Sequence, residues 1–208
     1  MCYSAESSQI SFIVGSLGAI YLLNTKEPAL KHAGLFLFAV VFIQLLEYMM
    51  WIDQECGKLN EYASKMVYPV LIIQMMTIFL GAYLYKTTFI HDKILVGLIA
   101  FSFYMTLKTI YLNFTNDSIF WCSKPNENSA LQWANFENVT MNESLMYYLL
   151  FLIAPFLMKN KKYGFTLLIS GLITFIATRY ENPYSNNSRW CFFSAFIPLI
   201  LILVKKMT

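Results

Sequence analysis

The sequence predicts an all-α integral membrane bundle of seven transmembrane helices, formed by a single domain over residues 1–208. The first observation is composition: 58% of the residues are hydrophobic and only 13% are charged, with a mean hydropathy of +0.52. A soluble domain carries about 25% charged residues. The second observation is that the apolar residues come in long runs, without the alternation of strands or the heptads of coiled coils.

Seven apolar runs define the expected spans. They cover residues 9–23, 33–52, 66–85, 94–112, 144–158, 163–178 and 191–204. The last three are short against the ~20 residues that a membrane helix needs, so we expect them to extend into flanking polar residues or to suit a thinner membrane. Prolines 69, 155 and 198 fall inside or at the edge of spans, which membrane helices tolerate. Residues 113–143 form the only sizeable segment outside the membrane.

The loop charges predict the orientation. Nine lysines, against only Glu27 and Asp92, fall on the side that receives the C-terminus. The N-terminal side carries five basic and nine acidic residues. Because basic residues in short loops mark the cytoplasmic side, we expect the N-terminus to be extracytosolic and the C-terminus cytosolic. The expected membrane is the endoplasmic reticulum, the plasma membrane or a viral membrane.

All four cysteines fall on the predicted extracytosolic side. The disulfide candidates are Cys2, Cys56, Cys122 and Cys191. An oxidising compartment permits disulfides, and four cysteines allow three pairings, while scattered free thiols are the alternative. We expect no metal site, because both histidines lie on the other side and no Cys-x-x-Cys motif occurs.

Two opposite charges are predicted at matching depth inside the spans. Glu47 and Lys108 each lie about five residues from the outer end of their span. A lone charge deep in a bilayer costs at least ~2.5–3.5 kcal/mol on insertion scales. We therefore expect the two side chains to form an ion pair or to share a water-filled pocket.

Helical spacing and span ends add neighbours to this pocket. Gln44 and Trp51 share a helix face with Glu47, and Tyr104 shares one with Lys108. The expected ligand-binding set is completed by Gln74 within the third span and by residues at the outer ends of spans, namely Glu6, Asp53 and Arg179. This set predicts a polar pocket in the outer leaflet, walled by aromatic residues.

Three functions compete for this pocket. It can be a structural ion pair, a site for a small solute or ion in a transporter or channel, or the site of a membrane-embedded enzyme in which Glu47 is the acid or base. No catalytic triad or HExxH motif is visible, so an enzyme is less favoured. A net charge of +3 does not indicate nucleic-acid binding. Our hypothesis is solute or ion binding or transport; the alternatives are a lumen-facing enzyme and a structural or assembly protein of a viral or cellular membrane. No cofactor or oligomeric state is indicated.

Part of the chain is similar to a known group of sequences. The opening "MCYSAESS", the later "LLEYMMW" and the following "DQECGKLN" resemble an uncharacterised family of polytopic membrane proteins from giant viruses, protists and bacteria. The resemblance covers about the first 60 residues and implies no activity. It does imply that five residues belong to one cluster at the outer face: Cys2, Glu47, Asp53, Cys56 and Asn60.

Overall fold

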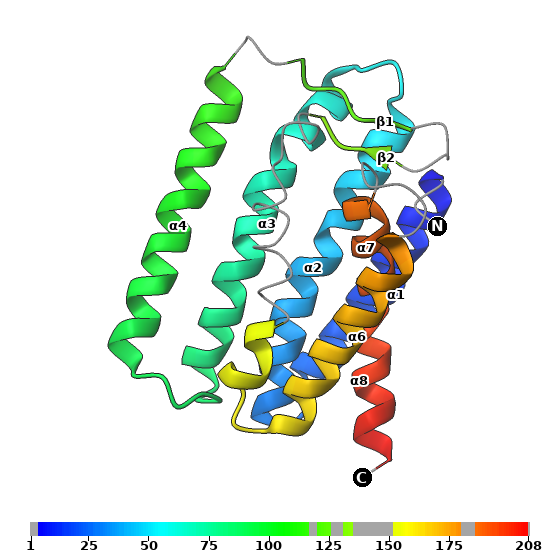
Figure 1. Ribbon diagram of the computed structural model, residues 1–208. Helices are drawn as coiled ribbons and strands as arrows, with labels where there is room; N and C mark the ends of the chain where they lie inside the picture. Colours follow the sequence, from blue (N-terminus) through cyan, green and yellow to red (C-terminus); the bar gives the residue numbers. More distant parts are fainter. Residues whose placement is uncertain (1–3, 117–119, 126–130, 135–151, 180–185, 208) are drawn as a thin grey trace.

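The protein is an all-α bundle with one small hairpin (Figure 1). The computed structural model describes residues 4–116, 120–125, 131–134, 152–179 and 186–207. The elements in these ranges are α1 (Ala5–Leu23), α2 (Pro28–Ile52), α3 (Lys58–Leu84), α4 (Asp92–Thr115), β1 (Lys124–Pro125), β2 (Leu131–Gln132), α6 (Lys161–Arg179), α7 (Asn186–Ser194) and α8 (Ile197–Lys206). Residues 152–157 are also helical. The predicted all-α class is therefore confirmed.

Helix α2 lies at the centre of the bundle and α4 at its edge (Figure 1). The first four helices run up and down in sequence, so that α2 packs against α1 and α3, and α4 packs against α3. The other side of α2 is covered by α6, α7 and α8. We call the end with the Cys56–Cys122 bond the disulfide end, and the opposite end, where α8 finishes with Lys205 and Lys206, the lysine end.

Four candidate membrane spans occur in the described part of the chain. They are Pro28–Ile52, Lys58–Leu84, Asp92–Thr115 and Ser188–Lys206, each long and apolar enough to cross a bilayer. This agrees with an integral membrane protein. Helices α1 and α6, each 19 residues long, are not among these four candidates. Most of the expected span 144–158 lies outside the described residues.

The helix boundaries extend beyond the expected spans. Helix α3 begins at Lys58, eight residues before its expected start, and continues through Pro69 to Leu84. Its first turn is capped by Asp53, and Pro28 begins α2 at a position where its missing N–H costs nothing. Helices α2 and α3 can therefore begin with polar residues, because the free backbone groups of their first turns are capped or absent. Hydropathy alone does not predict these longer helices.

The expected last span is divided into two helices. Helix α7 ends at Ser194, a turn follows at Ala195 and Phe196, and α8 starts with Pro198 in its first turn. Glycines of α1 allow this turn to approach closely: a Cβ at Gly15 would lie 2.5 Å from the carbonyl oxygen of Ala195. One membrane span is thus broken where it packs against α1.

Candidate solute or ion site

The centre of the site is the carboxylate of Glu47, which has no exposed surface. Its Oε2 accepts a hydrogen bond of 2.7 Å from Nε2 of Gln44, and its Oε1 accepts one of 3.0 Å from Nε1 of Trp133. Gln44 Oε1 in turn accepts a 2.8 Å hydrogen bond from the Ser11 hydroxyl. These four residues, Ser11, Gln44, Glu47 and Trp133, are called the Glu47 cluster below.

A further serine of α1 lies at the level of Glu47. The Ser11–Gln44 contact sets the antiparallel register of α1 and α2, and the approach of Gly15 to Val41 agrees with it. One turn towards the disulfide end, this register brings Ser8 opposite Glu47. Ser8 is fully buried, and within the described ranges its hydroxyl has no hydrogen-bond partner. A buried polar atom without a partner is rare enough to need an explanation.

Helix α7 brings polar residues to the same region. Gly15 of α1 lies against Ala195 and Gly18 against Pro198, so the two segments run in parallel. One turn further towards the disulfide end, the buried Cys191 is level with Ser11. Ser194, at the end of α7, is fully buried, and its hydroxyl has no partner within the described residues. Helices α1, α2 and α7 therefore each carry buried polar groups in this part of the bundle.

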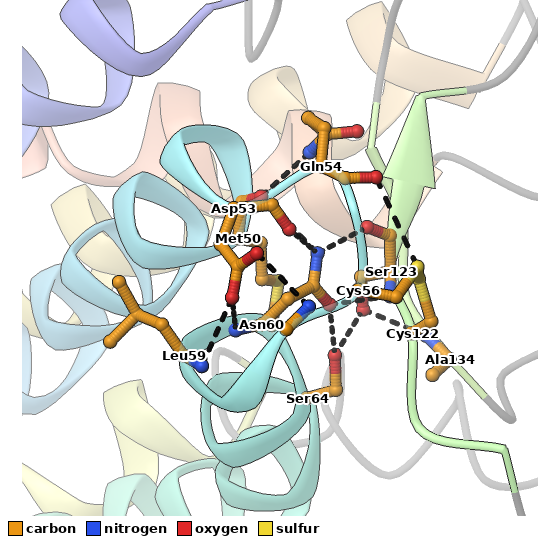
Figure 2. Close-up of a disulfide and its surroundings, with 11 residues drawn as sticks. Met50, Asp53, Gln54, Cys56, Leu59, Asn60, Ser64, Cys122, Ser123 and Ala134 are labelled. Carbon is orange, nitrogen blue, oxygen red and sulfur yellow. Dashed lines mark hydrogen bonds between the residues drawn. A yellow bond between two sulfur atoms is a disulfide. The ribbon is translucent and has the colours of Figure 1, made fainter.

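A disulfide fastens the hairpin to the bundle. Cys56, between α2 and α3, is bonded to Cys122, with Cα atoms 5.3 Å apart (Figure 2). The expectation of at least one disulfide is therefore confirmed for this pair. Cys191 is a buried free thiol, so its candidacy for a disulfide is wrong, because it lies on α7 inside the bundle and not in a loop. Cys2 lies outside the described residues.

Asn60 joins the hairpin to the ends of α2 and α3 (Figure 2). Its Nδ2 donates to the carbonyl oxygens of Met50, Asp53 and Ser123, and its Oδ1 accepts from the backbone N–H of Ser123. The Ser64 hydroxyl bonds to both Asn60 Oδ1 and the Ser123 hydroxyl. The side chain of Asn60 thus bonds to the backbone of Ser123 as a neighbouring strand would, although the two residues are more than 60 positions apart in the sequence.

The same network fixes the position of Trp133. The Ser123 hydroxyl accepts a 3.0 Å hydrogen bond from the backbone N–H of Ala134, the residue after Trp133. Trp133 itself is 3% exposed, so the indole is inserted into the bundle. The hairpin is therefore anchored on one side by α2 and α3 and completes the Glu47 cluster on the other.

Asp53 belongs to this anchor and not to the carboxylate site. Its side chain accepts hydrogen bonds from the backbone N–H groups of Gly57, Leu59 and Asn60. The N–H of Asn60, helped by the other two, lowers the pKa of Asp53, and partial desolvation opposes this effect. The resemblance had placed Asp53, Cys56 and Asn60 in one cluster with Glu47. The structure brings the first three together at the end of α2, six residues or more along the chain from Glu47.

A pocket of about 400 Å³ lies on the hairpin. It is lined by Phe120, Cys122, Lys124, Pro125, Gln132, Trp133 and Ala134. Trp133 is the residue that this pocket shares with the Glu47 cluster.

The structure does not bring Lys108 to Glu47. Lys108 is exposed on α4, and Tyr104 on the same helix is 59% exposed. Helix α3 stands between α2 and α4 (Figure 1), and Glu47 and Lys108, both within the described residues, form no ion pair. The expected pair is therefore wrong. The distance of a residue from the end of its span says nothing about which way that helix face points.

The other predicted residues are scattered. The contacts of His32 with Ile78 and of Met50 with Asn60 set the α2–α3 register. This register puts Gln74 about 16 Å from the level of Glu47 along the bundle. Trp51 is half-buried, and its indole N–H has no partner among the residues that the structure describes; Glu6 is exposed. The side chain of Arg179 lies outside the described residues.

Sequence reasoning missed Ser8, Ser11 and the role of Trp133. The i, i+3 spacing of the serines on one face of α1 is a readable signal of a polar stripe. No local pattern marks Trp133, since its partner is 86 residues away. In the part of the chain that the structure covers, no group of three or more His, Cys, Asp or Glu could hold a metal ion.

No family model, no curated protein and no solved structure matches this chain. The class of protein therefore rests on the fold: a helical bundle with four helices fit to cross a membrane and a covered carboxylate at one end.

Proposed function

We propose that the protein is a seven-span membrane protein, with the N-terminus out and the C-terminus in, that binds and transports a small cationic solute or ion at the Glu47 cluster. One observation carries the proposal: the carboxylate of Glu47 is fully buried in α2, the most hydrophobic of the four candidate spans. Ionisable groups within membrane spans are costly and commonly mark the path of a substrate or ion.

The surrounding groups favour a cation. Glu47 provides carboxylate oxygens, Gln44 an amide oxygen, and Ser8 and Ser11 hydroxyl oxygens. Oxygen atoms of these kinds coordinate hard cations and accept hydrogen bonds from ammonium groups. The break between α7 and α8 adds support, because discontinuous helices commonly line the binding sites of transporters.

The two ends of the bundle support the proposed orientation. The disulfide suits an oxidising compartment and joins the segments expected outside the cytosol. The lysine end carries the residues that favour the cytosol.

A structural role for Glu47 is the second candidate. The observation in its favour is that both carboxylate oxygens already accept hydrogen bonds, from Gln44 and from Trp133. Such a cluster can serve mainly to fasten the hairpin onto the helices.

Thermal unfolding of the purified protein in detergent distinguishes the two roles. Chloride salts of lithium, sodium, potassium, ammonium and methylammonium are compared at constant ionic strength with Glu47→Gln and a control, Glu61→Gln. Glu61 is a half-exposed carboxylate, paired with Lys65, at the same end of the bundle. A bound cation raises the unfolding temperature because it stabilises only the folded state.

We expect one of these cations to raise the unfolding temperature of the wild type and of Glu61→Gln, and to have no effect on Glu47→Gln. Flux of that cation into proteoliposomes should be lost in the same variant. If no cation separates Glu47→Gln from the wild type, and this variant is less stable in every salt, the structural role is correct.

A further inference from the structure

We infer that the pocket on the hairpin is the entrance to the Glu47 cluster, that Trp133 is its gate, and that the ligand it admits is a small ammonium-type cation. The inference rests on the proposed function and names the route and the ligand class for that site. The indole of Trp133 bonds to the buried carboxylate of Glu47, and the same residue lines the pocket.

Trp133 belongs to both the pocket on the hairpin and the Glu47 cluster. One part of the residue lines the pocket of about 400 Å³, and its Nε1 lies 3.0 Å from Glu47 Oε1. Trp133 is 3% exposed, so its indole is buried where it bonds to the carboxylate. Rotation of this one side chain would open a path from the pocket to Glu47, with no movement of a helix.

The surroundings of the gate are held in place. The disulfide between Cys56 and Cys122 and the hydrogen bonds of Asn60 fix the segment before β1. The Ala134 N–H is tied to the Ser123 hydroxyl. Because the backbone on both sides of the pocket is fastened, the movement that opens the site is confined to side chains.

The ligand class follows from what Glu47 binds in the closed state. Its two oxygens accept N–H groups, one from an amide and one from an indole. An ammonium group offers the same N–H donors together with a compensating positive charge, so it can replace the indole N–H. Phe120, which is exposed in the pocket lining, offers an aromatic face to a cation before it reaches the carboxylate.

Lys124 provides a test of whether the ligand that enters the pocket is positively charged. It is exposed in the lining of the pocket, where its ammonium repels a cation that enters. We expect Lys124→Gln to lower the concentration of methylammonium that half-saturates the thermal shift by about two- to fivefold at low ionic strength. The difference should disappear at 1 M salt, because the Debye length there is only about 3 Å.

The route is tested by labelling Glu47 with a water-soluble carbodiimide and an amine, followed by peptide mass spectrometry of the intact, detergent-purified protein. We expect little labelling in the wild type and at least a tenfold increase in Trp133→Ala. Trp121→Ala is the matched control, since Trp121 is a buried tryptophan of the same segment that is absent from the pocket lining. It should label like the wild type.

Trp133→Phe gives a second measurement, because it keeps an aromatic ring and removes only the N–H. It should fold if Trp133→Ala does not, and its labelling should lie between those of the wild type and an open site. In Trp133→Ala with Gln132→Cys, a bulky thiol reagent attached in the pocket should reduce the labelling of Glu47 again.

Equal labelling of Glu47 in the wild type and both Trp133 variants overturns the gate, and labelling that the attached reagent does not reduce overturns the route. These results need no ligand, so they are independent of the thermal shifts. A folded Glu47→Gln variant that still responds to the cation overturns the proposed function and leaves the labelling result standing.

Discussion

Replacing Asn60 by aspartate tests whether one side chain fastens the hairpin to the bundle. The two residues have nearly the same shape, and aspartate keeps the oxygen that accepts from Ser123. It loses the Nδ2 group that donates to the carbonyl oxygens of Met50, Asp53 and Ser123. It also places a carboxylate oxygen against those three acceptors in a position without exposed surface.

The expected loss is about 4 kcal/mol of the free energy of unfolding. Each buried carbonyl that loses its donor costs about 1–3 kcal/mol, and the amide has only two hydrogens for its three acceptors, so about two full bonds are lost. The measurement is unfolding by titration with sodium dodecyl sulfate in a mild detergent. Asn24→Asp is the control, because the exposed amide of Asn24 makes a single bond to the carbonyl of Ile20. We expect it to cost less than about 1 kcal/mol.

A difference of less than 1 kcal/mol between Asn60→Asp and Asn24→Asp would refute the assigned role of Asn60. Limited proteolysis gives an independent check, since the hairpin should be cut faster in Asn60→Asp than in the control. Unchanged cutting would show that the disulfide alone holds the segment.

Three more changes have clear expected outcomes. The pKa of Asp53 is lowered on folding, so the stability that it provides is present above its unfolded pKa of 3.8 and is lost as the pH falls through the lower folded pKa; Asp53→Asn should flatten the fall in unfolding temperature below about pH 4. The double change Cys56→Ser with Cys122→Ser should abolish the mobility difference between reducing and non-reducing gels, and it should destabilise the protein by at most about 4 kcal/mol for a closed loop of this length, with a sequence separation of 66. Gly81→Ala should cost about 1–3 kcal/mol in detergent unfolding, because its Cβ would lie 2.4 Å from a buried imidazole ring, whereas Gly97→Ala, with no atom within 4 Å, should be neutral.

The sequence predicted the helical class and the central place of Glu47 because both depend on local properties. Hydropathy marks the runs that become α2, α3 and α4, and a carboxylate inside such a run must be buried among polar groups. Gln44 followed from its i, i+3 spacing with Glu47. Cys56 and Cys122 were predicted to lie on the same side of the bundle, and the structure joins them there.

The partners of Glu47 could not be predicted, because they depend on helix order around the bundle. Lys108 was placed beside Glu47 from the span ends alone, yet α4 packs on α3 and presents Lys108 to the exterior. Trp133 comes from a hairpin whose position is set by Asn60 and the disulfide, contacts that span more than 60 residues. No periodicity reports such contacts, so the hairpin was expected only as an extramembrane loop.

The distance along the chain between Glu47 and its indole partner has a consequence for biosynthesis. The carboxylate enters its helix early, whereas the tryptophan that covers it is translated 86 residues later. During this interval the hydrogen bond from Trp133 is missing, while that from Gln44, on the same helix, can already form. The burial of Glu47 is therefore completed only after the hairpin has docked and the Cys56–Cys122 disulfide has formed. Oxidation of the cysteines is thus expected to be a late step in the folding of this protein.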